Sequence, residues 1–321
     1  MTSPDELLPP ALVAHCDWST SPDRRLISYA ILSKGKYTAH APQFVNDATT
    51  LLDRLREKVS SSASILVGFD FPIGIPKAYA DRANVSEFRP FLKQLGNGKW
   101  QDFYSVCKHP SEISIYSPFY PFNSTPKGSR KRSHLVDALR LTDFNDLLRT
   151  CERPQPGIPA AGALFWTLGA KAPGRAAIHG WSNVIVPALD HPQIRLWPFD
   201  GPLHELLKPG NTVLAEAYPT QYHFSILKSQ FNGKRSLEKR KEQAANLYAW
   251  ANKHTVQLQS GLVRDIHTGF PQGDDAFDAV LGLFGMIEVA LAIRPPGDPT
   301  NPLLQTLEGW ILGQPGPPHV P

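Results

Sequence analysis

Three short apolar segments that each run into an acidic residue constrain the fold of this chain more than any other feature. They are ALVAHCDW at 11–18, SILVGFD at 64–70 and TVLAEAYP at 212–219. Apolar runs of this length, bounded by turn residues, are typical of strands that are buried on both faces. If the strands lie parallel, their carboxyl ends share one edge of a sheet, which is where open α/β sheets bind ligands. We therefore expect Asp17, Asp70 and Glu216 to lie close together.

The segments between these strands indicate a mixed sheet with helices beside it. RRLISYAIL at 24–32 and KYTAHAP at 36–42 are separated by SKG, which has the glycine of a tight turn, so we expect three antiparallel strands at the start. NDATTLLDRLREKV at 46–59 has leucines at helical spacing and predicts an amphipathic helix. The charged segment at 236–254 predicts a long helix.

The middle of the chain has a different texture, with many prolines, aromatic residues and irregular loops between short helical patches. We interpret it as an insertion subdomain. The expected division is 1–70 for the first half of the core, 71–210 for the insertion, 211–312 for the second half of the core and 313–321 for a tail. The tail is too rich in proline and glycine for us to expect it to pack as an element.

Charge permits a polyanionic partner without requiring one, because a net charge of +4 is only mildly basic. The strongest candidates for phosphate contacts are the basic residues of the insertion, namely SRKR at 129–132, Lys171 and Arg175. A solvated basic surface is the simpler alternative for each of them. We expect nucleic acid as the partner, and the sequence does not indicate an oligomeric state.

The chain has three cysteines, too far apart for a zinc module or a dense disulfide framework. The first residues, MTSPDELLPP, have neither the basic nor the apolar region of a signal peptide. No apolar run is long enough to span a membrane. We expect a soluble, cytoplasmic protein with free thiols.

The segment QGDDAFDAVLGLFGM at 272–286 places Asp275 and Asp278 three positions apart, on one face of a helix. Helix capping and the helix dipole account for Asp274 and partly for Asp275. They do not account for Asp278, whose neighbours on the helix are apolar on most sides. A carboxylate in such surroundings is costly unless a cation or hydrogen bonds compensate its charge. The sequence therefore predicts a cation near Asp278.

The acidic residues together predict a metal site. Carboxylates that meet in one place cannot all stay ionised without a cation, and oxygen ligands favour Mg²⁺ or Mn²⁺ over zinc. The candidate catalytic residues are Asp17, Asp70, Glu216, Asp275 and Asp278. Each has a simpler interpretation when taken alone, as a cap, a turn residue or a surface acid. Their coincidence at the ends of core elements favours the metal site.

The order of hairpin strands, helix, strand with aspartate, later strand and closing helix with aspartate matches the ribonuclease H fold. DAFDA at 275–279 resembles the D-x-x-D-A helix start of RuvC-like Holliday junction resolvases. With AHCDWS, VGFDFPIG, EAYPTQ and EGWILG, the chain resembles a largely uncharacterised bacterial and archaeal family of predicted nucleases. The resemblance implies an α/β fold with a ribonuclease H-like mixed sheet flanked by helices. The segment 71–210 would then be a large, mostly helical and irregular insertion between the fourth and fifth core strands.

The resemblance also implies roles for the acidic residues. Asp17 would be the first-strand aspartate that bridges two metal ions, and Asp70 would be the second acidic ligand. Asp275 and Asp278 would complete the site from the last helix. Glu216 has no sure counterpart in the resolvases, which commonly place a glutamate in the role of Asp70. The implied activity is hydrolysis of a phosphodiester by a two-metal mechanism that uses Mg²⁺ or Mn²⁺.

Other readings stay open. His267, shortly before the acidic helix, could orient water or a phosphate, or could be a hydrogen-bonded structural residue. An ATP-dependent phosphotransferase of the actin and sugar kinase class would share the core fold, and DWSTS at 17–21 faintly resembles its phosphate loop. Neither Asp17 nor Asp70 is followed by the glycine that such a loop needs. A non-catalytic nucleic-acid-binding protein would be marked by a broken acidic set, which this chain does not have.

Overall fold

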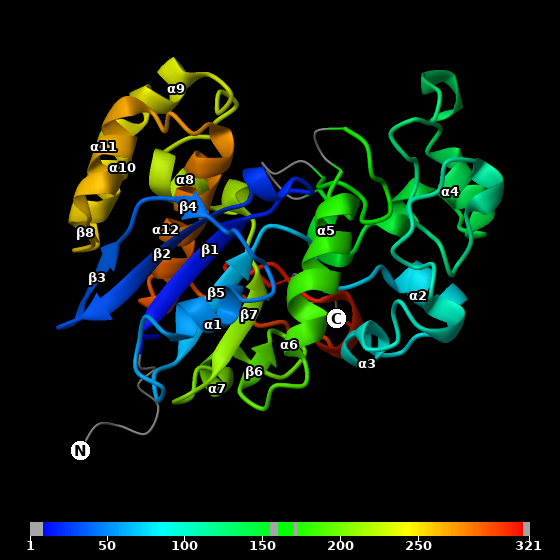
Figure 1. Ribbon diagram of the computed structural model, residues 1–321, viewed down its shortest axis with the longest axis horizontal. Coiled ribbons are helices and arrows are strands. Elements are labelled where there is room, and N and C mark those ends of the chain that lie inside the picture. The colour runs from blue at the N-terminus through cyan, green and yellow to red at the C-terminus, as the bar shows by residue number, and fades with distance from the viewer. Residues whose placement is uncertain (1–8, 155–159, 170–171, 317–321) are drawn as a thin grey trace.

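The computed structural model describes residues 9–154, 160–169 and 172–316 (Figure 1). Its strands are β1 (Leu12–Asp17), β2 (Leu26–Ser33), β3 (Lys36–Ala39), β4 (Gln43–Phe44), β5 (Ile65–Phe69), β6 (Ile194–Leu196), β7 (Thr212–Glu216) and β8 (Gln257–Leu258). They form one sheet in the order β6-β7-β5-β1-β2-β3-β8, and β4 pairs with β2. The strands β1, β5, β7 and β6 are parallel, whereas β2 is antiparallel to β1 and β3. The expected α/β class, the mixed sheet and the parallel core strands are confirmed.

Helices connect the strands and cover both faces of the sheet. They are α1 (Leu51–Arg56), α2 (Lys77–Ala83), α3 (Phe88–Leu92), α4 (Ser133–Ala138), α5 (Gly174–Gly180), α6 (Val186–Ala188), α7 (Leu203–Leu206), α8 (His223–Leu227), α9 (Leu237–Glu242), α10 (Ala244–Lys253), α11 (Ser260–Thr268) and α12 (Asp274–Ala290). The single long helix that we expected at 236–254 is two helices, which meet at Gln243. Within the described ranges, each helix is too short or too polar to cross a membrane.

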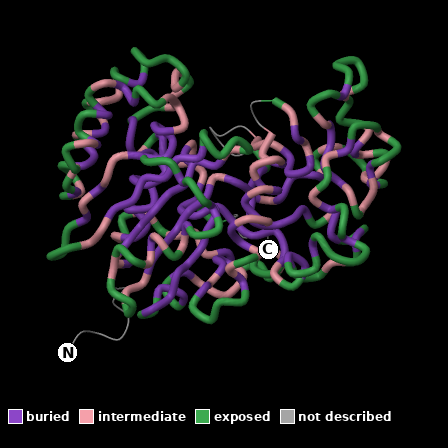
Figure 2. The backbone as a smooth tube through the Cα atoms, in the orientation of Figure 1, coloured by how far each residue is buried: buried purple, intermediate pink, exposed green. Residues whose placement is uncertain are grey.

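The two faces of the sheet pack against different parts of the chain, because successive side chains of a strand point to opposite faces. Val13, Leu66 and Val213 share one core with α12, α10 and α11. Their neighbours one residue away, such as Leu12 and Ile65, share a second core with α1, α5 and the middle of the chain. Figure 2 shows the central strands as the most continuously buried part of the molecule.

The predicted insertion is joined closely to the sheet. Aromatic residues of this region, including Phe103 and Trp181, belong to the same core cluster as Phe69 of β5. The indole N–H of Trp181 donates a 2.8 Å hydrogen bond to the carbonyl oxygen of Pro72, just after β5. Its last part, β6, is an edge strand of the sheet. The segment 71–210 that we expected to be an insertion therefore includes one strand of the core sheet.

The start of the predicted tail is packed, contrary to our expectation. Gln314 is fully buried and its side-chain amide donates a 3.2 Å hydrogen bond to the carbonyl oxygen of Cys151. Just before it, the backbone N–H of Leu312 donates a 2.8 Å hydrogen bond to the carbonyl oxygen of Glu216. Proline and glycine exclude a regular element here, but they do not exclude packing.

The three cysteines are buried free thiols, as expected.

Candidate active site

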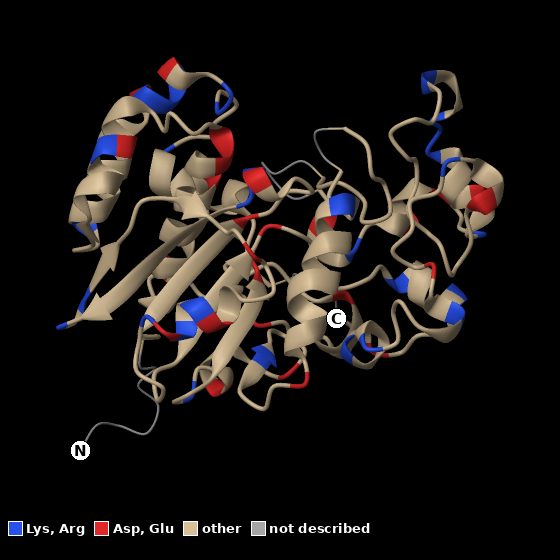
Figure 3. Ribbon diagram, in the orientation of Figure 1, with Lys and Arg blue, Asp and Glu red and all other residues tan. Residues whose placement is uncertain are grey.

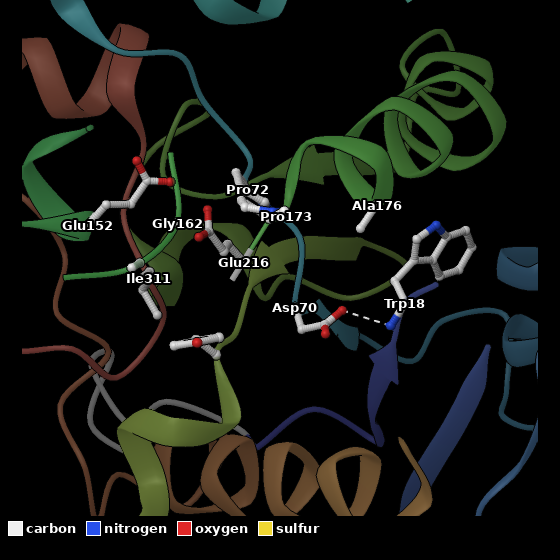
Figure 4. A pocket seen from close by; sticks show the side chains of 12 residues that line it. Trp18, Asp70, Pro72, Glu152, Gly162, Pro173, Ala176, Glu216 and Ile311 are labelled. Atoms are coloured by element: carbon white, nitrogen blue, oxygen red, sulfur yellow. Dashed lines mark hydrogen bonds between the residues drawn. The ribbon is translucent and has the colours of Figure 1, made fainter. Parts of the chain in front are cut away.

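The register of the sheet brings Asp17 and Asp70 to the same level. Cys16 of β1 pairs with Phe69 of β5, so the aspartates that follow them occupy the next level. The backbone N–H of Trp18 donates a 2.7 Å hydrogen bond to Oδ1 of Asp70 and holds this carboxylate at the end of β1 (Figure 4). Asp17 is only 8% exposed. Among the described residues, none donates a hydrogen bond to the carboxylate of Asp17. Burial and the charges of neighbouring groups are what shift its pKa.

Helix α12 carries Asp278 over the ends of these strands. All residues of the helix from Ala276 to Ala290 are buried, which explains its almost wholly apolar sequence. Gly282 permits the close approach of helix and sheet, because a Cβ atom at this position would lie 2.3 Å from ring atoms of His15 in β1. Asp278 lies one turn before Gly282, on the same face of the helix. Its carboxylate is therefore close enough to Asp17 for the two charges to repel each other.

The cation that the structure shows at Asp278 is Lys234, whereas we expected a metal ion there. Lys234 lies between α8 and α9, and its ammonium group forms an ion pair with Oδ2 of Asp278. The carboxylate is buried, whereas the lysine side chain is 45% exposed. The sequence contains no signal that selects this lysine from the other basic residues of 228–241. Lys234 is thus a site residue that we did not predict.

The carboxylates of Asp17, Asp70 and Asp278 resist ionisation together. Burial raises the pKa of Asp17 well above its usual range, and the charges of Asp70 and Asp278 raise it further. Burial also raises the pKa of Asp70 to about 7, against the lowering effect of its backbone hydrogen bond. The pKa of Asp278 is about 6, because burial outweighs the nearby ammonium group of Lys234. Three carboxyl groups thus lie together beside Lys234, the one lysine among the described residues that is paired with them, and they do not all ionise at neutral pH.

Asp275 is held by a different cation. It lies in the first turn of α12, and its two carboxylate oxygens accept 2.9 Å hydrogen bonds from Nε and Nη2 of Arg24. This bidentate pair lies at the protein surface, where the arginine side chain is 59% exposed. The charge of Asp275 still raises the pKa values of Asp17 and Asp278. The structure thus places Asp275 at the rim of the cluster, with both oxygens already bound.

Glu216 lies on the other face of the sheet. It pairs with Phe69 of β5, so it is one level earlier than Asp70. Because side chains alternate between faces, Glu216 points away from the face on which Asp17 and Asp278 meet. We expected Glu216 to lie beside the other carboxylates, and this expectation is wrong. The error came from counting it as a strand-end residue without knowing the register.

The carboxylate of Glu216 forms a buried ion pair with Arg149. Nη1 and Nη2 of Arg149 each donate a 2.8 Å hydrogen bond to it, and the backbone N–H of Ile73 donates a third at 2.7 Å. Arg149 is fully buried and also binds the carboxylate of Glu152. The positive charge of Arg149 and the negative charge of Glu216 thus compensate each other within the protein. Glu216 serves here as a structural residue that ties the strand end to the middle of the chain.

A cavity of about 220 Å³ extends from Asp70 along the edge of the sheet. Figure 4 shows Trp18 at the side of Asp70, with Glu216, Glu152 and Ile311 at the opposite side. The wall between them consists mainly of small apolar residues and prolines, such as Ala176 and Pro173. The cavity is therefore a space next to the acidic cluster, with apolar walls and carboxylates at its ends.

Arg175 and His267, two further predicted residues, do not lie at the cluster. Lys171 lies outside the described residues. Arg175 is on α5, with its guanidinium carbon 5.6 Å from the ring centre of Phe122. His267 is exposed in the last turn of α11 and is not one of the residues that line the cavity. For Arg175 and His267, the structure provides no contact with the three aspartates.

The cluster is not a preformed metal cage. Over the described ranges, no group of three or more His, Cys, Asp and Glu side chains is arranged to hold a metal ion. A cation at Asp17, Asp70 and Asp278 would thus require the side chains to adjust. Comparison of the chain with protein-family models, with curated proteins and with solved structures finds no match.

Proposed function

We propose that this protein is a metal-dependent phosphodiester hydrolase, in the wide sense a nuclease, and that Asp17, Asp70 and Asp278 bind its divalent cation. One observation carries the proposal. Burial raises the pKa of all three carboxylates, the charges of Asp70 and Asp278 raise that of Asp17 further, and among the described residues Lys234 is the one ammonium group that forms an ion pair with them. Buried like charges of this kind are typical of sites that bind a cation.

The chemistry of the donor groups fits a hard cation. The cluster offers only carboxylate oxygens, which Mg²⁺ and Mn²⁺ prefer over the nitrogen and sulfur ligands of zinc sites. Lys234 forms an ion pair with the carboxylate of Asp278. Its side chain is almost half exposed and can move toward solvent without loss of a packed core. Lys234 and the divalent cation would then compete for the same carboxylate.

A bound Mg²⁺ or Mn²⁺ would activate water and stabilise the leaving oxygen of a phosphodiester. The other groups of the site belong to the chain itself. The hydrogen bond from the N–H of Trp18 orients the carboxylate of Asp70. Lys234, once released, would lie near the phosphate and could neutralise one of its oxygens. Burial raises the pKa of Tyr218, so its hydroxyl stays protonated at the edge of the cavity and can donate a hydrogen bond.

The order of the core elements supports the same class of function. The strand with Asp17 and the hairpin strands after it, helix α1, the strand followed by Asp70, the later strand β7 and the closing helix with Asp278 follow the order that we expected for a ribonuclease H-like fold. We include this fold assignment in the proposal. It rests on the order of elements and on the placement of three aspartates, since Glu216 and Asp275 are bound to arginines.

The test is a titration of Mn²⁺ into metal-free protein by calorimetry, followed by hydrolysis of bis(p-nitrophenyl) phosphate. The variants are Asp278→Asn and, as a matched control, Asp53→Asn, which removes an exposed carboxylate from α1. We expect saturable binding and hydrolysis in the wild type and in Asp53→Asn. Both should be lost in Asp278→Asn.

A second titration separates an absent site from an incomplete one. It is made in the presence of a phosphorothioate oligonucleotide, because substrate phosphates can complete a carboxylate site. If the wild type binds no Mn²⁺ in either titration, the proposal is wrong. Hydrolysis at an undiminished rate after removal of metal ions would also contradict it.

A further inference from the structure

A second cavity lies in the middle of the chain, apart from the acidic cluster, and its character is basic. It has a volume of about 420 Å³ and lies between the loop at 108–110, the loop at 125–131 and the first turn of α4. Lysine, histidine and hydroxyl side chains dominate its lining, which includes Lys108, Lys131, His109, His134, Thr125 and Ser129. Among the described residues that line the cavity, none carries a carboxylate.

Hydrogen bonds fix the walls of this basic cavity. The hydroxyl of Thr125 donates a 2.8 Å hydrogen bond to the carbonyl oxygen of Lys108 and so joins the two loops. Nε of Arg130 donates a 2.6 Å hydrogen bond to the carbonyl oxygen of Thr125. The hydroxyl of Tyr120 donates a 2.5 Å hydrogen bond to the carbonyl oxygen of Ser129. The cavity is therefore formed before any ligand binds.

The positive charges of the cavity are available to a ligand. Lys108 and Lys131 are exposed, and within the part of the chain that the structure describes neither forms a salt bridge. Nδ1 of His134 lies 3.1 Å from the hydroxyl of Tyr120, which leaves Nε2 for other partners. The ammonium groups of Lys108 and Lys131 and the hydroxyl of Ser129 are donors around this space that suit a phosphate.

Glu112 is an acidic residue next to this cavity, and Asp137 is another, on α4. The carboxylate of Glu112 accepts hydrogen bonds from the backbone N–H groups of Lys108 and His109, at 2.7 Å and 3.3 Å. These bonds, more than the neighbouring charges, lower the pKa of Glu112, so it is ionised at neutral pH. Its one negative charge is outweighed by Lys108 and by the run of basic residues at 130–132. Figure 3 shows this gathering of Lys and Arg around α4.

We propose that the basic cavity binds a backbone phosphate of a nucleic acid, at a distance from the place of hydrolysis. This inference rests on the proposed function, because a nuclease has to position its substrate. Lys131 stands between Arg130 and Arg132 in the sequence. A row of basic residues of this kind suits an extended chain of phosphates better than a single phosphate ion. Contacts of this kind add affinity and register without reading base sequence.

The test is fluorescence anisotropy of a labelled single-stranded DNA in EDTA, over a series of KCl concentrations. Lys108→Gln/Lys131→Gln removes two charges from the cavity. The matched control, Lys36→Gln/Lys208→Gln, removes two exposed lysines at the opposite edge of the sheet, where β1 and β7 begin. We expect the cavity variant to bind about tenfold more weakly. The slope of log K against log [KCl] should fall by about 1.4, since each neutralised phosphate of a single strand contributes about 0.7.

A variant that keeps the charge checks for damage to the fold. Lys108→Arg/Lys131→Arg should bind the DNA nearly as well as the wild type. Equal losses in the cavity variant and in the control would mean that only total charge matters, and would overturn the proposal. Inorganic phosphate that displaces the DNA as efficiently as an unlabelled strand does would also overturn it, in favour of a site for the free ion. Because EDTA is present, these outcomes do not depend on whether the acidic cluster binds metal or is active.

Discussion

The ammonium group of Lys234 donates a hydrogen bond to the buried carboxylate of Asp278, which lies 44 residues further along the sequence. The pair joins the segment before α9 to the start of α12. Among the described residues, Lys234 is the cation that forms an ion pair with the three buried aspartates Asp17, Asp70 and Asp278. The arrangement suits a site in which an internal cation holds the carboxylates together until a stronger cation replaces it.

Replacing Lys234 by methionine should destabilise the metal-free protein and strengthen its response to Mn²⁺. Removal of one partner leaves Asp278 buried without its counter-ion, which costs about 3–5 kcal/mol for a fully buried pair. Because Lys234 is almost half exposed, we expect a smaller loss of about 1–2 kcal/mol. Urea unfolding in EDTA and in excess Mn²⁺ would measure both effects. A double-mutant cycle with Asp278→Asn that gave no coupling energy would contradict this account.

Asp17→Asn should stabilise the protein at neutral pH. An aspartate in the unfolded chain has a pKa near 3.9, whereas burial and the charges of Asp70 and Asp278 raise the pKa of Asp17 well above that in the folded protein. Its contribution to stability is therefore fully present only below the unfolded pKa and is lost as the pH rises. An asparagine avoids this penalty, and we expect a gain of about 1–2 kcal/mol at pH 7.

The measurement for Asp17→Asn is the free energy of urea unfolding at pH 7 and at pH 4. The advantage of the variant should shrink at the lower pH, where the carboxyl becomes protonated in the unfolded chain as well. Asp53→Asn, on the surface, should leave the free energy of unfolding nearly unchanged at both pH values. If Asp17→Asn were less stable than the wild type at pH 7, Asp17 would be a structural residue.

Arg149→Met should be strongly destabilising. It would leave the buried carboxylates of Glu216 and Glu152 without their shared counter-ion, at a cost of about 3–5 kcal/mol. Glu216→Gln should cost less, because Arg149 keeps Glu152 as a partner. We expect Glu216→Gln to bind Mn²⁺ as the wild type does in calorimetry. Loss of Mn²⁺ binding in that variant would return Glu216 to the metal site.

The sequence predicted the parts of the site that depend on short-range patterns. The apolar runs before Asp17 and Asp70 are buried strands, and they are parallel, so the two aspartates meet at one edge. The apolar surroundings of Asp278 led us to expect a metal ion beside it, and the structure shows the ammonium group of Lys234 at that carboxylate, which we did not predict. These features follow from burial and from the cost of a lone buried charge, which a local pattern can reveal.

The parts that were missed depend on pairing between distant segments. The face on which Glu216 lies is set by its pairing with Phe69, and its partner Arg149 is 67 residues away in the sequence. The edge strands β6 and β8 have three and two residues, too few for a periodic pattern. Register and long-range ion pairs leave no mark that can be read from one sequence alone.

His223 should make the protein less stable as the pH falls below neutrality. It is buried, and Nδ1 accepts a 3.4 Å hydrogen bond from the backbone N–H of Phe231. Burial lowers its pKa to about 4, whereas an unfolded histidine has a pKa near 6.5. Its contribution to stability is therefore fully present above pH 6.5 and is lost as the pH falls toward 4. The loss amounts to about 3 kcal/mol, at 1.36 kcal/mol for each pKa unit.

The difference in unfolding free energy between wild type and His223→Gln isolates this contribution, because the buried aspartates and His15 are the same in both proteins. We expect the wild type to lose about 3 kcal/mol relative to the variant between pH 7 and pH 4. His267→Gln, which changes an exposed histidine on α11, should follow the wild-type profile. Parallel profiles for wild type and His223→Gln would mean that His223 takes up its proton in the folded protein as easily as in the unfolded chain. The buried ring beside Phe231 would then have access to water or to an acceptor, and α8 would pack less closely than its contacts indicate.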